Sequence, residues 1–254
     1  MMLQTGAGRK SVHDYLLGST TALVAGLVNV CSVMAFFAFS SNVTGHVAVF
    51  AQELAHGKWH QVWVVLAWMS AFMLGAFLAN FVVIRLEAHK RLAGSLPLAL
   101  EVLILALTAY YGQHHYLETL RETELMVGAL LFAMGIQNGT VSTVSNSIVR
   151  TTHLTGLFTD LGMEISLFSQ PRFRSNPTLR FKLKLHLLIL GGYLVGGTLS
   201  GLLYDSWGFS TLYLATAILL SVVLHDLLVS ASSSIASAQL RPAPKAAPVC
   251  VDAE

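Results

Sequence analysis

Charge is scarce in this sequence, in which Asp, Glu, Lys and Arg together make up 11% of 254 residues. Soluble domains carry roughly 25% charged residues, so this chain cannot cover a globular surface with charge. Fifteen basic against thirteen acidic residues leave a net charge of +2, too small an excess to indicate nucleic-acid binding. The composition therefore excludes a soluble enzyme and a nucleic-acid-binding protein.

Cysteine is also scarce, and the familiar catalytic motifs are missing. Cys31 lies in an apolar run and Cys250 in a polar stretch, which excludes a disulfide framework, a zinc site and a paired redox motif. The sequence contains no HEXXH, GXSXG or P-loop pattern. We expect no enzymatic activity, no metal and no cofactor.

Hydrophobic residues are abundant instead, at 54% of the chain. A helix that crosses a bilayer needs ~20 mostly apolar residues, and six runs meet this requirement: 15–40, 60–84, 92–111, 125–149, 185–204 and 210–228. The first run is too long for the apolar core of a signal peptide, so we expect it to be retained. The sequence predicts an all-α, polytopic membrane protein with six spans, embedded in the lipid bilayer.

Two shorter segments, 42–56 and 151–170, combine apolar residues with ionisable ones. Their lengths leave open whether they cross the membrane, re-enter it or lie at the interface. If neither crosses, the basic clusters fall on one side: Arg9 and Lys10, Arg85 to Arg91, Arg172 to Lys184, and Arg241 with Lys245. Because Lys and Arg accumulate on the cytoplasmic side, this pattern favours two re-entrant or interfacial helical segments.

The same pattern places both termini in the cytoplasm. We expect a cytoplasmic N-terminus over 1–14 and a membrane domain over 15–229. The stretch 230–254 is rich in Ser, Ala and Pro and is predicted to be a disordered cytoplasmic tail.

The two halves of the membrane domain, 15–111 and 125–229, resemble each other. Four matches occur in the same order: Gly26 and Asn29 with Gly135 and Asn138, Thr44-Gly45 with Thr155-Gly156, Glu53 with Glu164, and FMLGAFLA with YLVGGTLS, which equates Gly75 with Gly196. Three crossings in each half place the halves in opposite orientations, so the sequence predicts an inverted 3+3 repeat with a site near the midplane. The alternative is that the small residues only allow helices to pack closely.

The motifs SNVTGH, GIQN and VRTTHLTGLFTDLG resemble those of the YoaK-type bacterial membrane-protein family, also described as domain of unknown function 1275. The resemblance covers roughly residues 15–228. It implies a multi-pass protein of the bacterial inner membrane, and it assigns no role to any residue.

The candidate residues for a substrate or ion path are the ionisable groups and repeated polar groups of these segments. They are Asn29, Asn42, Thr44, His46, Glu53, Asn138, Arg150, Thr152, His153, Thr155, Asp160 and Glu164. Ionisable groups at membrane depth usually serve a function, and helix N-termini attract anions. Ser41, Asn42, Thr151 and Thr152 could instead act only as helix caps.

The charged candidates allow two interpretations each. The Arg150 guanidinium suits a carboxylate or oxyanion, but it could be an ordinary interface charge. The acidic residues could exchange protons with His46 or His153 as relays, whereas Glu53 could simply pair with Lys58 and Glu164 with Arg172.

The sequence therefore predicts a small-solute transporter or channel with a polar site between inverted halves. A small anion or organic acid is the favoured solute, with proton coupling left open. The alternative is a non-transporting membrane module that binds and regulates a partner protein or a lipid. A homo-oligomer is compatible with either function.

Overall fold

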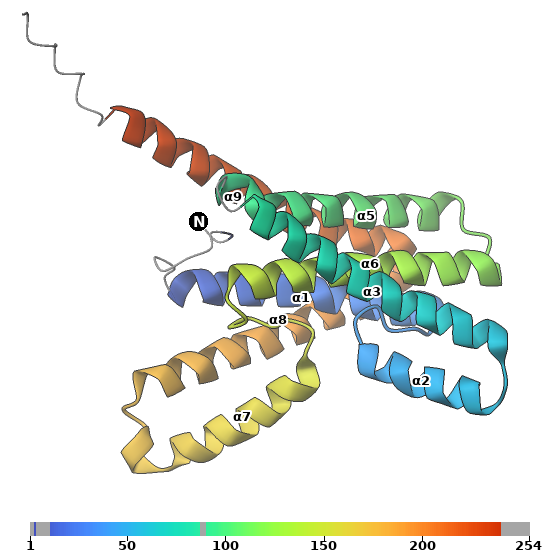
Figure 1. Cartoon of the computed structure of the whole chain (residues 1–254), viewed down its shortest axis with the longest axis horizontal. Coiled ribbons are helices and arrows are strands. Elements are labelled where there is room, and N and C mark those ends of the chain that lie inside the picture. The colour runs from blue at the N-terminus through green and yellow to red at the C-terminus, as the bar shows by residue number, and fades with distance from the viewer. Residues whose placement is uncertain (1–2, 4–10, 87–89, 240–254) are drawn as a thin grey trace, which may run out of the picture.

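The structure is a computed structural model that describes residues 3, 11–86 and 90–239 (Figure 1). Within these residues the chain is helical and contains no strand. The elements are α1 (Ser11–Phe36), α2 (Val43–Ala55), α3 (Trp59–Arg85), α4 (Lys90–Ala93), α5 (Ser95–His114), α6 (Leu120–Val144), α7 (Leu154–Ser169), η2 (Pro171–Phe173), α8 (Pro177–Trp207), η3 (Gly208–Thr211) and α9 (Leu212–Gln239).

Five stretches of helix within these residues are long and apolar enough to cross a membrane. Four of them are α1, α3, α5 and α6. The fifth, Pro177–Val229, contains α8, the short η3 and most of α9. The predicted all-helical membrane protein is confirmed, and α2 and α7 are separate short helices at the positions of the two predicted short segments.

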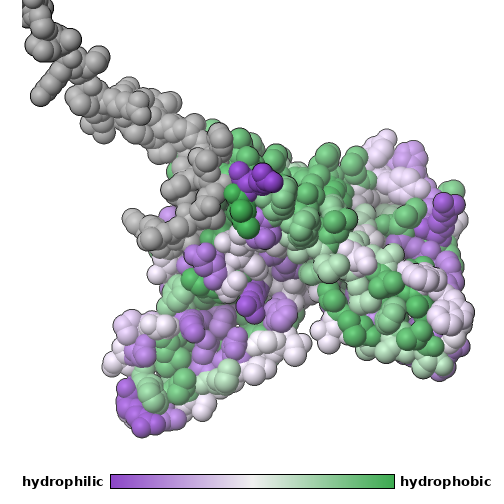
Figure 2. Space-filling view, in the orientation of Figure 1, coloured by the Kyte–Doolittle hydropathy of each residue, from purple (hydrophilic) through white to green (hydrophobic). Residues whose placement is uncertain are grey.

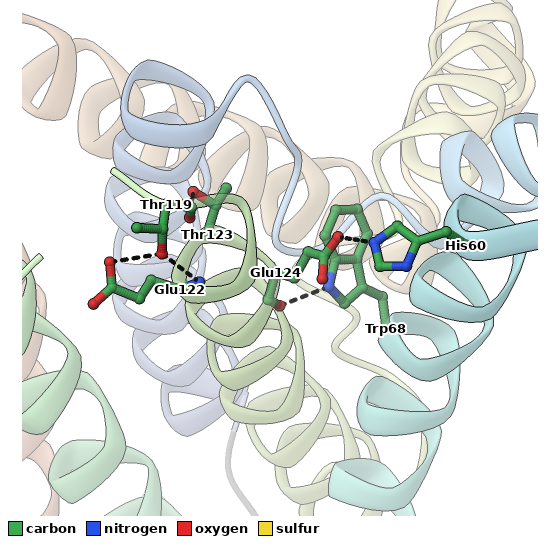
Figure 3. Close-up of polar contacts among 6 residues, drawn as sticks. All are labelled: His60, Trp68, Thr119, Glu122, Thr123 and Glu124. Atoms are coloured by element: carbon green, nitrogen blue, oxygen red, sulfur yellow. Dashed lines mark hydrogen bonds and ion pairs between the residues drawn. The ribbon is translucent and has the colours of Figure 1, made fainter. Parts of the chain in front are cut away.

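Local side-chain chemistry explains where several helices begin. Thr119 precedes α6, and its hydroxyl oxygen accepts a hydrogen bond from the Glu122 amide at 3.3 Å while donating to the Glu122 carboxylate at 2.9 Å (Figure 3). The first of these bonds satisfies one of the amides that the first turn leaves unpaired. Asn176 caps α8, and Pro177 occupies the first helical position, where the missing amide costs nothing.

Helix ends differ from the predicted runs because hydropathy measures composition rather than backbone conformation. The first run was predicted to reach Ser40, but α1 ends at Phe36 and Phe37 has a φ of 54°. The fourth run was predicted to reach Val149, but α6 ends at Val144, before Asn146 and Ser147 adopt positive φ. In both places the chain leaves the helix shortly before a short segment begins.

Helices extend into both predicted terminal regions. Helix α1 begins at Ser11, inside the region 1–14 that was predicted to precede the membrane domain. Helix α9 continues to Gln239, so residues 230–239 are helical rather than part of a disordered tail. Ser and Ala are adequate helix formers next to an existing helix, which composition alone did not reveal. The rest of the predicted tail, 240–254, lies outside the described residues.

Helices α1 and α8 are in close backbone contact through glycine. A Cβ atom at Gly26 would overlap with the carbonyl oxygen of Tyr193, and one at Gly196 would overlap with that of Leu23. Leu23 precedes Gly26 by three residues, and Tyr193 precedes Gly196 by three. Each glycine therefore packs against the backbone of the partner helix, one turn before the glycine of that helix.

Helices α3 and α6 make the same kind of contact. A Cβ at Gly75 would overlap with the carbonyl oxygen of Phe132, and one at Gly135 would overlap with that of Phe72. The offsets along the chain are again three residues on each side. At one end of this pair, Glu124 of α6 makes two contacts with α3, both at 2.8 Å (Figure 3). Its backbone oxygen accepts a hydrogen bond from Trp68 Nε1, and its carboxylate lies against His60 Nε2.

Contacts along these pairs give the directions of the helices. Ser19 lies beside Gly192 and Val30 beside Gly201, so α1 and α8 run in the same direction. Phe72 lies beside Gly135, and Thr143 donates to Asn80 at 2.9 Å, so α3 and α6 also run in the same direction.

The two pairs run in opposite directions. Leu17, near the start of α1, belongs to the same buried cluster as Val144 at the end of α6. Val28, later in α1, belongs to the cluster that contains Val127 near the start of α6. Helix α1 is therefore antiparallel to α6 and, through α6, to α3. Consequently α3 starts at the end of the molecule where α1 finishes.

The arrangement leaves apolar side chains on the outside of the molecule. Figure 2 shows hydrophobic residues spread over the region of α3 and α5, with hydrophilic residues gathered at the far end of α7 and α8. Exposed residues of α3 include Met73, Leu74 and Phe77, each more than half exposed. An apolar outer surface of this kind fits a lipid environment.

Candidate functional site

Asn29, in the second half of α1, holds the chain that follows α1. Its side-chain oxygen accepts hydrogen bonds from the Ser40 amide at 2.9 Å, the Ser40 hydroxyl at 3.3 Å and the Ser41 hydroxyl at 3.1 Å. Its side-chain nitrogen donates to the Tyr193 hydroxyl of α8 at 2.7 Å. Asn29 therefore folds residues 37–42 back along α1, so that α2 starts beside α1 rather than beyond its end.

Helix α2 begins with a side-chain cap and packs on α3. The Asn42 side-chain oxygen accepts from the Gly45 amide at 3.1 Å, as predicted for a cap. His46 is buried one turn later, where its Nε2 lies 2.8 Å from the Phe39 carbonyl oxygen and its ring meets Trp68 edge-on. These contacts fix the first turn of α2 against both the returning chain and α3.

The start of α7 is held by the equivalent asparagine of the second half. The Thr152 hydroxyl donates to the Asn138 side-chain oxygen at 2.9 Å. The cap position of α7 is His153, which makes no side-chain capping bond. The expectation that Thr151 or Thr152 caps this helix is therefore wrong, because the Thr152 hydroxyl is engaged by α6.

Both short helices point their first turns at one cavity, called here the central cavity. In Figure 1, α2 and α7 lie toward opposite ends of the bundle, and their N-terminal ends approach each other in the middle. The central cavity has a volume of about 600 Å³. Its lining comprises Asn29, Phe39, residues 41–44, Met69, Phe72, Met73, residues 152–155 and Tyr193.

The lining of the central cavity comes from both halves and contains no Asp or Glu. Thr44 and Thr155, the matched threonines, are both part of it. Phe72 and Tyr193 begin the matched segments FMLGAFLA and YLVGGTLS, and both also line it. The cavity therefore has corresponding residues of the two halves in its wall.

Six of the candidate residues line this cavity, and two lie directly behind it. Those in the lining are Asn29, Asn42, Thr44, Thr152, His153 and Thr155. His46 lies behind the start of α2, and Asn138 lies behind the start of α7, where it contacts Thr152.

The two matched glutamates are not part of the central cavity. Glu53 lies in the last turn of α2, where its carboxylate pairs with Lys58 Nζ at 3.1 Å. Glu164 is buried against α8, where its carboxylate lies 3.0 Å from His186 Nδ1 rather than beside Arg172. The two glutamates are equally spaced from the threonines, but they lie in different surroundings.

The remaining charged candidates, Arg150 and Asp160, line a second cavity of about 520 Å³ between α7 and α8. We call it the α7–α8 cavity. His153 lines both cavities. Lys182 and His186 of α8 also belong to its lining. The candidate residues are therefore divided between a central and a lateral space.

Several residues of the cavities were not predicted from the sequence. Tyr193 is embedded in GGYLVGG, which indicates helix packing, and Met69, Phe72 and Met73 are apolar residues in a long run. The match between FMLGAFLA and YLVGGTLS was the signal for Phe72 and Tyr193. His186 and Lys182 had no such signal, because the first half has Val65 and Gln61 at the positions equivalent to them.

The described residues contain no group of three or more His, Cys, Asp or Glu side chains that could hold a metal ion. Cys31 is a buried free thiol in α1. The chemistry available in the central cavity is accordingly that of hydroxyl, amide and imidazole groups, together with the backbone amides at two helix starts.

Comparison with known proteins gives a family. No curated protein and no solved structure matches the chain. The family described as "Protein of unknown function (DUF1275)" matches residues 17–225, which include both short helices and both asparagines. The match covers most of the chain, and the chain therefore belongs to the DUF1275 family.

Proposed function

We propose that this protein is a small-solute transporter or channel whose substrate site is the central cavity. The observation that carries the proposal is that the N-terminal ends of α2 and α7 line one cavity together with residues from the middle of α1, α3 and α8. Sites between discontinuous or re-entrant helices, near the middle of the bilayer, are typical of transporters.

The proposal includes six crossings, made by α1, α3, α5, α6, α8 and α9. Because α3 starts at the end of the molecule where α1 finishes, the α2 segment enters and leaves on one side of the membrane. The same holds for α7, since α8 is antiparallel to α6. The segment Pro177–Val229 has 53 residues, which fits two crossings rather than one. With the basic residues on the cytoplasmic side, both termini are cytoplasmic in a bacterial inner membrane.

This topology predicts opposite exposure for two loops. Leu117, between α5 and α6, is 75% exposed, and Ser175, just before α8, is also exposed. Single cysteines at these positions, in a chain with Cys31→Ala and Cys250→Ser, are treated with an impermeant thiol reagent in intact bacterial spheroplasts. The Leu117→Cys variant is expected to be labelled, and the Ser175→Cys variant to be labelled only after lysis. Equal labelling of both before lysis contradicts six crossings.

The proposal also includes an inverted repeat of 15–111 and 125–229. Its support is the equality of offsets in the two halves. Gly26 packs on the Tyr193 carbonyl oxygen, three residues before Gly196, and Gly135 packs on the Phe72 carbonyl oxygen, three residues before Gly75. Asn29 and Asn138 each bind the hydroxyl group that lies three residues before the matched threonine, on Ser41 and Thr152 respectively. Packing glycines alone do not require this second correspondence.

A small anion or organic acid is the solute that the central cavity fits best. Each helix start contributes a partial positive charge and backbone amides, and α7 has no side-chain cap. No carboxylate in the lining opposes an anion. Hydroxyl groups of Thr44, Thr155 and Tyr193 supply neutral donors in the same space.

The function is tested by flux through proteoliposomes. We expect labelled formate and chloride to enter proteoliposomes faster than protein-free liposomes, whereas glycerol should enter both at the same rate. Potassium and valinomycin are present to compensate the charge that the anions carry. Thr44→Trp is expected to lower this flux strongly, because the large indole ring narrows the central cavity. Val47→Trp is the control, since Val47 is 51% exposed on α2 and does not line the cavity. Absence of flux for every solute would favour a non-transporting regulatory module.

A further inference from the structure

The α7–α8 cavity has features of a binding site in its own right. Its volume of about 520 Å³ is close to that of the central cavity. Three segments enclose it: the α6–α7 connection, the first half of α7 and the beginning of α8. The cavity is therefore lined by three segments and is large enough for a small solute.

The charges around this cavity favour an anion. Arg150 and Lys182 line it, and neither makes an ion pair with any of the described residues. Asp160 is the one carboxylate in the lining, and it too has no ion-pair partner there. Two unpaired cations against one carboxylate leave the space with a net positive charge.

The nearby carboxylate of Glu164 is not part of the lining of this cavity. It is 7% exposed and engaged by His186 Nδ1 at 3.0 Å, which directs it at α8. The Glu164–His186 contact connects α7 to α8 beside the cavity, and His186 itself belongs to the lining. Glu164 thus acts as a positioning residue for the wall.

His153 is part of the lining of both cavities. It stands at the start of α7 and lines both the α7–α8 cavity and the central cavity. The two cavities are therefore neighbours, with His153 at the border between them.

We propose that the α7–α8 cavity is a second binding site, for a free small carboxylate or phosphate held by Arg150 and Lys182. Any role of this site in transport rests on the proposed function, but the binding itself does not. The guanidinium supplies two parallel donors to an oxyanion, and Lys182 supplies a second charge from α8. Asp160 limits the site to ligands of low negative charge by repulsion.

The test measures binding without transport. Full-length protein carrying Thr44→Trp, which narrows the central cavity, is placed in phosphatidylcholine nanodiscs. The excess line width of the chloride NMR signal reports bound anion, and formate is added as the competitor. Arg150→Gln and Lys182→Gln are each expected to weaken the apparent formate affinity by roughly tenfold or more, because each removes at least one charged hydrogen bond. Asp160→Asn is expected to strengthen it several-fold, an effect that misfolding cannot produce.

The controls decide between this site and two alternatives. Arg172→Gln removes a basic residue near the same end of the molecule that is absent from the cavity lining, and it is expected to leave the affinity unchanged. An equal loss with Arg172→Gln would overturn the site in favour of general surface charge. Loss of formate binding in phosphatidylglycerol nanodiscs would overturn it in favour of an anionic lipid headgroup. Binding without flux would contradict the proposed function alone, and flux without this binding would contradict the second site alone.

Discussion

Alanine at Gly196 or Gly135 is expected to destabilise the protein strongly. At each position the new Cβ would overlap with a backbone carbonyl oxygen of the neighbouring helix, that of Leu23 or that of Phe72. Backbone cannot rotate away as a flexible side chain can, so the helices must separate. Overpacking of this kind costs about 1–3 kcal/mol or more. The midpoint of thermal unfolding in detergent, followed by the loss of monodisperse protein on size exclusion, should fall for both variants.

Gly191 provides the matched control for this prediction. It lies on α8, five residues before Gly196, and a Cβ there meets nothing within 4 Å. Because alanine is a better helix former than glycine, Gly191→Ala is expected to leave the unfolding temperature unchanged or to raise it. If the Gly196→Ala and Gly191→Ala variants unfolded at the same temperature, the result would contradict the close backbone contact between α1 and α8 at Gly196.

These glycines illustrate what the sequence could predict and what it could not. The repeat equated Gly26 with Gly135 and Gly75 with Gly196. In the fold, however, Gly26 faces α8, which carries Gly196, and Gly135 faces α3, which carries Gly75. Similarity between segments reveals which positions are equivalent, whereas contact depends on how the two halves interlock. That information lies in the tertiary packing and not in the spacing.

The asparagines and threonines lie closer together in the fold than the acids do. Asn29, Thr44 and Thr155 all line the central cavity. Glu53 and Glu164 come nine residues after the threonines, about two and a half turns along a helix. That far from the threonines, the two glutamates have different neighbours. Glu53 pairs with Lys58, and Glu164 contacts His186.

Helix ends were the least predictable part of the fold. The apolar run continues past Phe36, and the predicted fourth run continued through Ser145 to Ser147 to reach Val149, but the backbone turns at both places. In the first half the turn is stabilised by Asn29, whose partners Ser40 and Ser41 lie more than ten residues away along the chain. A hydropathy window cannot detect a bond of that span, so the return of the chain into the bundle becomes visible only in the fold.

The meeting of the two short helices at one cavity is tested most directly by a cross-link between Thr44 and Thr155. Both positions are replaced with cysteine in the Cys31→Ala, Cys250→Ser chain, and a protease site is placed between α5 and α6. After treatment of membranes with a short bifunctional thiosulfonate and cleavage of the loop, the two halves are separated on a denaturing gel. The control pair is Val49→Cys with Thr155→Cys, because Val49 is exposed on α2 and does not line the cavity.

We expect the Thr44–Thr155 pair to keep the two halves joined until a reductant is added, and the Val49–Thr155 pair to release them. Release of the halves in both cases would mean that the starts of α2 and α7 do not share a cavity in the membrane, and the proposed solute site would then be excluded.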